Sequence, residues 1–342
     1  MSNVVLSILI VSHNQKDLLP RCIDSVLGQK LLFPYEIIIS DDRSDDGTWE
    51  LIEKYESEYP DVIRGVKCDS NECDPVNRSE RCGWNKANAY KYARGTFFVN
   101  IDADDYLKSD DIYQKQVELL IANPDCALCQ QRVWQLDEGM PLESGYAWPR
   151  SPLLKDGAVL DATTIIQYDL QGLNPTYMIR RDRECNPAEK FGKWFDDTII
   201  TLYYFQLGRV VFIDRADYVW VQYRNSISNS VENWDRNILC ATLPLQHSLL
   251  FPQYYKYFFL QPNPDLSKLL RKSLYSKLDI SDEMRDYLLE FDGFIFQYLA
   301  NGRGGIMEKI RVLRAFLLNR RMKKKKVASS NQIEELKELL IG

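Results

Sequence analysis

Acidic side chains gather at two points of the sequence, each directly after an apolar run. They are Asp41 and Asp42 after the run 35–40, and Asp102, Asp104 and Asp105 after the run 96–101. Neighbouring carboxylates repel one another unless a cation offsets their charge. Mg²⁺ and Mn²⁺ take oxygen ligands and commonly use one or two carboxylates together with substrate phosphates. One acidic turn would be an ordinary polar loop, but two such turns predict a site for a metal-held di- or triphosphate.

The elements that would position these carboxylates follow from the hydrophobic pattern. Apolar runs predict strands at 6–11, 35–40, 62–67 and 96–101, and amphipathic stretches predict helices at 18–29, 48–59 and 86–93. Strands and helices that alternate at this spacing indicate a parallel, doubly wound sheet. Ligands of such sheets bind beyond the carboxyl ends of the strands, which is where both acidic groups would lie.

The remainder of the chain divides into a mixed part and a helical part. Residues 110–224 are expected to contain a helix at 112–122, a strand at 126–136, a loop rich in Pro and Gly at 138–157, and short strands at 178–180 and 210–213. Beyond about residue 233 the pattern becomes helical and rich in aromatic side chains. We therefore expect an α/β domain over residues 1–232 and a helical C-terminal region over 233–342.

Composition and charge narrow the partners and the location. The 342 residues include 43 basic and 49 acidic side chains; without a broad basic excess, we expect no nucleic-acid partner. No apolar run reaches the ~18 residues of a membrane-spanning helix. The apolar run that begins at Val4 has no basic segment before it, so no signal peptide is expected. The cysteines would then be reduced thiols of a cytoplasmic protein.

Two groups of cysteines raise the question of a metal site. Cys126 and Cys129 have the C-x-x-C spacing, and Cys68, Cys73 and Cys82 share what is expected to be one loop region. A structural zinc site needs four ligands, and no second C-x-x-C completes the first pair. Because Cys126 and Cys129 fall in an expected buried strand, we interpret them as small apolar side chains of the core.

Four segments, in order over about residues 4–230, resemble the motifs of family 2 glycosyltransferases. The first is LSILIVSHN at 6–14, continued by SVLGQ at 25–29, and the second is ISDDRSDDGT at 39–48. The third is ARGTFFVNIDADD at 93–105, which contains a D-x-D motif, and the fourth is FDD at 195–197, followed by 223–224 and 226–230. D-x-D alone is a weak signal, but four ordered segments are a strong one. The resemblance implies the α/β GT-A fold: a doubly wound, mostly parallel, Rossmann-like sheet with a helical C-terminal extension.

The resemblance also assigns a donor site. His13 stands where an aromatic side chain commonly lies beside the nucleotide base, and Asp42, together with Asp41, would accept a hydrogen bond from a base that is typically uracil. Asp102 would lie near the ribose, and Asp104 would ligate a Mn²⁺ or Mg²⁺ ion that bridges the diphosphate. On this assignment residues 1–110 are the nucleotide-sugar binding half of the domain, and residues 111–232 are the acceptor half.

The catalytic base would be Asp197 or its neighbour Asp196, which replaces the family's Glu. Asp197 precedes an apolar Ile-Ile pair at a spacing that fits the start of a helix, whose dipole would favour an ionised carboxylate. Lys86 stands where the family has an Arg-Asn pair and would take the basic role near the phosphates. Arg224 would face the diphosphate or form a surface ion pair, and both interpretations stay open. Arg43 departs from the family's usual Gly.

The function implied is that of an inverting glycosyltransferase of the hexosyltransferase type. It would move a sugar from a nucleoside-diphosphate sugar, typically a UDP-sugar, to an acceptor hydroxyl in polysaccharide or lipid-linked glycan assembly. A carboxylate base is needed because a sugar hydroxyl is a poor nucleophile. One alternative is a non-catalytic sugar-nucleotide-binding scaffold. A second alternative is a phosphotransferase that forms an aspartyl phosphate at Asp102. The sequence argues against it, because Tyr106 stands where that motif has Thr or Val.

The acceptor side of the site is less defined. Trp148, Asn174, Tyr177 and Trp194 are candidate acceptor contacts by residue type alone. Near the C-terminus, apolar residues at 306, 310, 313 and 317 form a helical stripe that precedes the basic run 323–326. A basic amphipathic helix can lie on an anionic membrane, which would place the protein peripherally at the inner face of the membrane, beside a lipid-linked acceptor. A helix packed on the main domain is the alternative.

Overall fold

The structure is a computed structural model of the chain, and it describes residues 4–68 and 78–223 apart from 169, 171, 183, 193, 194 and 196. The described residues belong to the first of two compact units, Met1–Asn229, and the second unit is Ser230–Gly342. The helices expected beyond residue 233, including the basic amphipathic one, lie outside the described residues and stay predictions. Within the described part of the chain, no helix is both long and apolar enough to cross a membrane.

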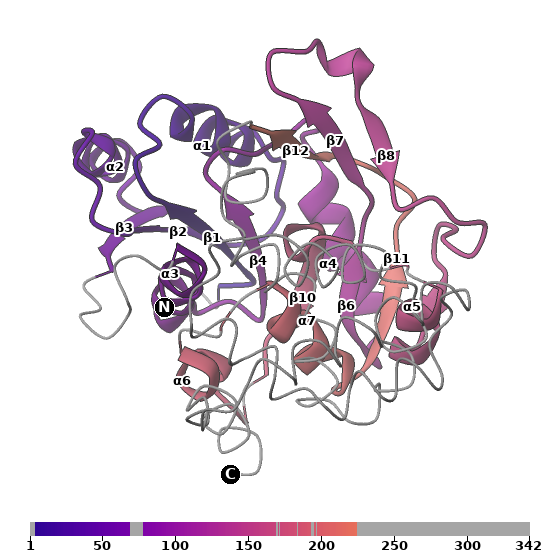
Figure 1. Cartoon of the computed structure of the whole chain (residues 1–342). Helices are drawn as coiled ribbons and strands as arrows, with labels where there is room; N and C mark the ends of the chain where they lie inside the picture. The colour runs from indigo at the N-terminus through magenta and orange to yellow at the C-terminus, as the bar shows by residue number, and fades with distance from the viewer. Residues whose placement is uncertain are drawn as a thin grey trace, which may run out of the picture. The chain divides into compact units, whose positions relative to one another are not determined.

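The main sheet has eight strands in the order β3-β2-β1-β4-β10-β6-β11-β9 (Figure 1). Its first half is parallel and consists of the four predicted strands, β1 (Leu6–Ser12), β2 (Tyr35–Asp41), β3 (Ile63–Lys67) and β4 (Phe97–Asp102). Its second half is mixed and consists of β10 (Tyr177–Arg180), β6 (Cys126–Gln130), β11 (Arg209–Phe212) and β9 (Val159–Leu160). Of these, β11 is parallel to β6, whereas β10 is antiparallel to both β4 and β6.

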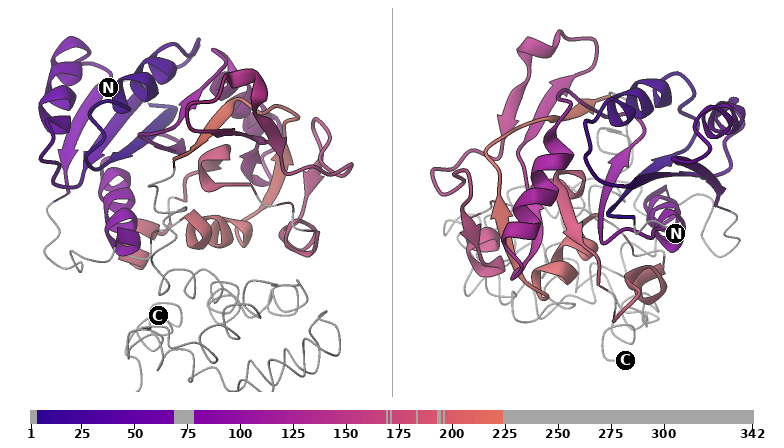
Figure 2. Two further views of the ribbon diagram at one scale, coloured as in Figure 1. Left: turned by 45° about the horizontal axis from the view of Figure 1, so that its top comes forward. Right: turned by 180° about the vertical axis from the view of Figure 1, so that it is seen from behind.

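Helices cover both faces of this sheet (Figures 1 and 2). The first face is covered by α1 (Leu19–Leu27), α2 (Thr48–Glu58) and α4 (Ile112–Ala122), which share one apolar core with Ile8 of β1 and Val99 of β4. The other face is covered by α3 (Arg78–Lys91) and α7 (Asp197–Phe205). There the ring of Phe98 lies 5.0 Å from that of Tyr90 and 5.7 Å from that of Tyr204. Because successive strand residues point to opposite faces, Phe98 and Val99 face different helix layers, and the doubly wound architecture is confirmed.

A second, four-stranded sheet has the order β5-β12-β7-β8. Its strands are β5 (Tyr106–Leu107), β12 (Tyr218–Gln222), β7 (Val133–Asp137) and β8 (Tyr146–Trp148), and β7 and β8 project as an arm in Figure 1. The prediction of one strand over 126–136 is therefore wrong, because β6 and β7 belong to different sheets. Between them the backbone N–H of Gln131 bonds to the carbonyl of Thr176 and that of Arg132 to the carbonyl of Arg215, so the chain changes partners within one apolar run.

The helix predicted at 86–93 is longer than expected, since α3 begins at Arg78 and ends at Lys91. Its first two turns are polar, so no apolar stripe marks them in the sequence, and Cys82 lies in this helix rather than in a loop. By contrast, α4 has the bounds predicted for it. The polar turns of α3 place side chains at the carboxyl ends of β1 and β2, where the site lies.

The cysteines of β6 are part of the core. Cys126 and Cys129 are both buried, and burial raises the pKa of both thiols. The interpretation of this C-x-x-C as apolar packing is confirmed. Cys68, directly after β3, is also buried, while Cys73 lies outside the described residues.

Candidate active site

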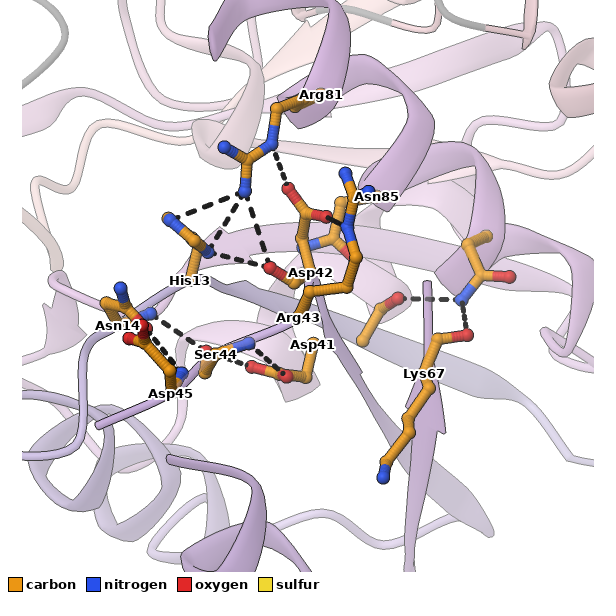
Figure 3. Close-up of polar contacts among 12 residues, drawn as sticks. His13, Asn14, Asp41, Asp42, Arg43, Ser44, Asp45, Lys67, Arg81 and Asn85 are labelled. Carbon is orange, nitrogen blue, oxygen red and sulfur yellow. Dashed lines mark hydrogen bonds and ion pairs between the residues drawn. The ribbon is translucent and has the colours of Figure 1, made fainter. Parts of the chain in front are cut away.

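Two loops at the carboxyl edge of the sheet are bound to each other by side chains of the second motif (Figure 3). Ser44 Oγ accepts a hydrogen bond from the backbone N–H of Asn14 at 2.8 Å, and Asn14 Oδ1 accepts one from the N–H of Asp45 at 2.9 Å. Asp46 Oδ2 accepts a hydrogen bond from the N–H of Lys16 at 3.1 Å. The serine and the last aspartate of this motif therefore shape the loops beside the site.

Asp41 and Asp42 differ in what surrounds them. Asp41 is only 1% exposed, and its carboxylate accepts hydrogen bonds from the Ser12 hydroxyl at 3.2 Å and from the Ser44 N–H at 3.0 Å. Asp42 lies between two guanidinium groups, with Arg81 Nε 2.7 Å from its Oδ2 and Arg43 Nε 3.1 Å from its Oδ1. Asp41 therefore holds the loop, and Asp42 is the member of the pair that meets the cations.

Arg43 has a backbone conformation that explains why glycine is usual at its position. Its φ of 54° falls in the left-handed region, which glycine enters without steric cost and other residues rarely adopt. The departure from glycine adds a guanidinium beside Asp42.

His13 and Arg81 complete the surroundings of Asp42 (Figure 3). His13 Nδ1 lies 2.7 Å from the backbone oxygen of Asp42. A carbonyl oxygen only accepts, so Nδ1 carries the proton, and Nε2 is free to accept from Arg81 Nη2 at 3.3 Å. An exposed ring, a carboxylate acceptor and a guanidinium donor thus meet at one point.

The three aspartates after β4 have different environments. Asp105 is buried and accepts hydrogen bonds from the Val221 N–H at 2.9 Å and from the Tyr218 hydroxyl, so it joins the end of β4 to β12. Asp102 and Asp104 are partly exposed. Burial raises the pKa of Asp102 to about 6, against the opposing effect of Lys86, and burial also raises the pKa of Asp104. The acidic cluster therefore contains one buried, structural carboxylate and two that are partly exposed.

Lys86 joins the third motif to the fourth. Its Nζ lies 3.4 Å from Asp102 Oδ1 and in direct contact with Asp197 Oδ1. The lysine side chain is 4% exposed, whereas that of Asp197 is 40% exposed. The neighbouring carboxylates raise the pKa of Lys86 well above its ordinary value although burial opposes this. Asp197 is the first residue of α7, which confirms the predicted helix start.

Sequence reasoning missed two contributors on α3, Arg81 and Asn85. Asn85 Nδ2 donates to the carbonyl of Ser12 at 3.0 Å, and one turn later Asn88 Nδ2 donates to the Ser40 hydroxyl at 2.9 Å. These polar residues lie four and three positions apart, which places them on one face of a helix. That spacing is a signal in the sequence, but it becomes visible only when the helix is extended back to Arg78.

The candidate acceptor contacts are only partly supported. Asn174 is 2% exposed and bonds to the side chains of Asn100 and Thr201, and Tyr177 is fully buried with its hydroxyl bonded to the N–H of Gly172. The interpretation of these two as acceptor contacts is wrong, because both belong to the core. Trp148 is half-buried in β8. Trp194, Asp196 and Arg224 lie outside the described residues, so their assigned roles stay predictions.

A divalent ion suits the residues at the end of β4 when a nucleotide accompanies it. Among the described residues, no group of three or more His, Cys, Asp or Glu side chains is arranged to hold a metal ion by itself. Asp104 is a partly exposed carboxylate two residues after Asp102. Mg²⁺ and similar ions commonly use one or two carboxylates and take their other ligands from substrate phosphates and water. The donor set therefore fits an ion that arrives with a diphosphate.

The fold and this site together define the class of the protein. In a sheet wound on both faces, ligands bind beyond the carboxyl ends of the strands. Here a ring, a carboxylate and a guanidinium lie at the ends of β1 and β2, and carboxylates lie at the end of β4. Residues 7–164 match the model of Glycosyl transferase family 2. The resemblance to family 2 glycosyltransferases that the four motifs predicted is therefore confirmed over these residues.

Curated relatives match a limited part of the chain. The poly(ribitol-phosphate) beta-glucosyltransferase of Bacillus spizizenii is 31% identical over 106 residues, 31% of this chain and 16% of that protein. A UDP-Glc:alpha-D-GlcNAc-diphosphoundecaprenol beta-1,3-glucosyltransferase of Escherichia coli is 32% identical over 102 residues, 30% of this chain and 36% of that protein. The chain spans about a third of the length of the uncharacterized mycobacterial proteins that it also matches.

Solved structures resemble the chain over nearly its full length. The crystal structure of S. aureus TarS 1-349 in complex with UDP has a TM-score of 0.57 and 17% sequence identity, and the match covers 96% of this chain and 95% of that one. At this identity the likeness establishes the GT-A fold.

Proposed function

We propose that the protein is an inverting glycosyltransferase that moves a sugar from a UDP-sugar to an acceptor hydroxyl. The observation that carries this proposal is the contact of Lys86 with both Asp102 and Asp197. Because of it, the carboxylate at the end of β4 and the half-exposed carboxylate that opens α7 lie beside one ammonium group. A donor-binding edge and a general base are the two parts that such a transfer requires.

The polar groups around Asp42 are complementary to uracil. The edge of uracil presents one N–H donor flanked by two carbonyl acceptors. Asp42 would accept from the N–H, and the guanidinium of Arg81, 2.7 Å from Asp42, would donate to a neighbouring carbonyl. The exposed ring of His13 would lie beside the base, with Asp41 holding the loop beneath it.

The reaction would be a single displacement. The acceptor hydroxyl gives its proton to Asp197 as its oxygen bonds to the anomeric carbon, and the bond from that carbon to the diphosphate breaks with its electron pair on the phosphate oxygen. A positioned carboxylate base is typically worth ~10²–10⁴-fold in rate. Asp102 would hold the ribose, and Asp104 would hold Mn²⁺ or Mg²⁺, which offsets charge on the leaving diphosphate when bound.

The relatives and the C-terminal sequence support one class of acceptor. Two relatives are named for transfer to poly(ribitol-phosphate) and to a diphosphoundecaprenol-linked sugar. The basic run 323–326 suits an anionic membrane. We therefore propose a polysaccharide or lipid-linked glycan acceptor, with the protein on the cytoplasmic side and peripheral to the inner face of the membrane.

A thermal-shift screen of nucleoside diphosphates and their sugars, with and without Mn²⁺, tests the donor. UDP is expected to stabilise the protein more than GDP, ADP or CDP, and Asp104→Asn is expected to remove the Mn²⁺-dependent part of that stabilisation without changing the unfolding temperature of the free protein. An equal response to all four nucleotides would contradict the uracil assignment. Stabilisation by UDP-sugars without transfer or Mn²⁺-dependent hydrolysis of any of them would favour a scaffold that binds sugar nucleotides.

A further inference from the structure

Lys86 is more deeply buried than a phosphate-binding lysine needs to be. Its side chain is 4% exposed, and its ammonium contacts the carboxylates of Asp102 and Asp197. A charge taken out of water costs several kcal/mol unless partners replace the solvent. The remaining groups that face Lys86 are the Cys82 thiol, one turn earlier on α3, and Asp104 at longer range. The ammonium is thus committed to carboxylates of β4 and α7.

The backbone of Asp197 is held to the same strand by a second set of contacts. Asn100 Nδ2, on β4, donates to Asn174 Oδ1 at 2.7 Å, and Asn174 Nδ2 donates to the Thr201 hydroxyl at 3.1 Å. That hydroxyl donates to the carbonyl of Asp197 at 2.7 Å. This buried series of hydrogen bonds connects β4 to the first turn of α7, and Lys86 connects β4 to the Asp197 side chain. Both main chain and side chain of one exposed carboxylate are therefore fixed relative to β4.

We propose that Lys86 is a positioning residue that holds the Asp197 carboxylate directed at the donor edge before substrates bind. The inference rests on the proposed function, in which Asp197 takes the proton of the acceptor hydroxyl. It assigns the lysine to the base, whereas the motif alone assigned it to the phosphates. A misplacement of about 1 Å in such a group can cost on the order of 10²-fold in rate. The gain in rate from a fixed carboxylate can therefore outweigh the cost of burying the Lys86 ammonium.

Two variants and one control separate the roles in kinetics. In Lys86→Met, kcat is expected to fall about 10- to 100-fold, with the donor KM nearly unchanged. Lys86→Arg keeps a cationic hydrogen-bond donor at this place and is expected to restore part of the lost kcat, which a merely structural role for the lysine would not predict. Lys91→Met, which removes an exposed lysine from the same helix, is expected to match the wild type.

A thermal-unfolding cycle tests the contact without any need for activity. Loss of one partner from a buried ion pair is strongly destabilising, so Lys86→Met is expected to lower the Tm by at least about 5 °C. Adding Asp197→Asn to that variant removes one of the two uncompensated carboxylates, so the double variant is expected to regain part of the loss. Asp197→Asn combined with Lys91→Met is expected to show simple additivity.

The outcomes distinguish this inference from the proposed function. Additive effects of Lys86→Met and Asp197→Asn on Tm would overturn the inference whether or not the protein is active. A raised donor KM in Lys86→Met with unchanged kcat would also overturn it, because the lysine would then serve the diphosphate. A wild-type protein that transfers no sugar would overturn the proposed function instead, while the unfolding cycle would still decide whether Lys86 holds Asp197.

Discussion

Residues of one type serve different purposes at this site, and their surroundings decide which. Asp41 and Asp105 are buried and accept hydrogen bonds from protein donors, so they are structural. Asp42 is paired with guanidinium groups, and Asp102 with a buried ammonium. Asp197 is the most exposed of the paired carboxylates and opens a helix. A carboxylate with access to solvent and to a second substrate is the one suited to accept a proton.

The base assignment predicts the effect of an isosteric change. Asp197→Asn keeps the shape of the side chain and removes its basicity, so turnover is expected to fall by at least ~10²-fold with donor binding nearly unchanged. Steady-state kinetics and calorimetric titration with UDP measure the two quantities. Asp196→Asn is the matched neighbour and is expected to cost less. The opposite ranking would move the base to Asp196, and two near-normal variants would mean that the fourth motif has another role.

Arg81 predicts a selective loss of nucleotide binding. Arg81→Leu removes a charged hydrogen-bond donor from beside the base, so UDP affinity is expected to fall about 10- to 100-fold, from ~1.5–3 kcal/mol for such a bond. Calorimetric titration measures it, with Arg64→Leu, an exposed arginine of β3, as the control. Arg81→Lys keeps the charge but lacks the guanidinium fork, so it is expected to restore only part of the affinity. Unchanged UDP affinity in Arg81→Leu would show that uracil does not bind beside Arg81.

At the scale of elements, α3 and the end of β4 bring the motifs together. The helix carries Arg81 to the carboxylate of Asp42 and, one turn and a residue later, Lys86 to the carboxylate of Asp197. The last residue of β4, Asp102, contacts Lys86, and the turn after β4 carries Asp105 to β12. The two sheets therefore meet at the same short turn that carries the D-x-D motif, and the geometry of that turn depends on both.

Asp105 predicts a stability effect at this junction. Asp105→Ala leaves the Tyr218 hydroxyl and the Val221 N–H buried without their acceptor, so the free energy of unfolding is expected to fall by about 2–4 kcal/mol. Burial and the neighbouring Asp104 and Asp102 raise the pKa of Asp105 well above its ordinary value, so the neutral amide of Asp105→Asn is expected to cost less. Urea unfolding followed by circular dichroism measures both. A loss below about 0.5 kcal/mol for Asp105→Ala would show that the sheets are joined elsewhere.

At the scale of the whole molecule, the C-terminal sequence predicts membrane affinity. Removal of residues 320–342 deletes a cluster of basic side chains, each worth about 1 kcal/mol near an anionic surface. The truncated protein is therefore expected to co-sediment with phosphatidylserine-rich liposomes much less than the full chain at low salt, and neutral liposomes serve as the control. If the full-length protein does not co-sediment with anionic liposomes, membrane binding by this segment is excluded, and a helix packed on a protein surface is favoured.

The sequence by itself determined the doubly wound sheet and the family, because both depend on local patterns. Buried parallel strands are apolar along most of their length, as in 35–40 and 96–101, and the carboxylates that follow these two then fall at the same sheet edge. Motif order added the residue types expected at a nucleotide-sugar site. Each of these signals lies within a short stretch of the chain, so the hydrophobic periodicity and the motifs of the sequence are enough to predict it.

Only the tertiary structure decided which residues meet. The pairing of Lys86 with Asp197, and of Arg81 with Asp42, joins segments distant in sequence, and no local period encodes such a contact. The same reason explains the errors. Asn174 and Tyr177 have the residue types of acceptor contacts but are buried by packing, and the run 126–136 divides because its two halves find partners in different sheets. Burial and partnership depend on the whole fold, so residue type alone leaves them undetermined.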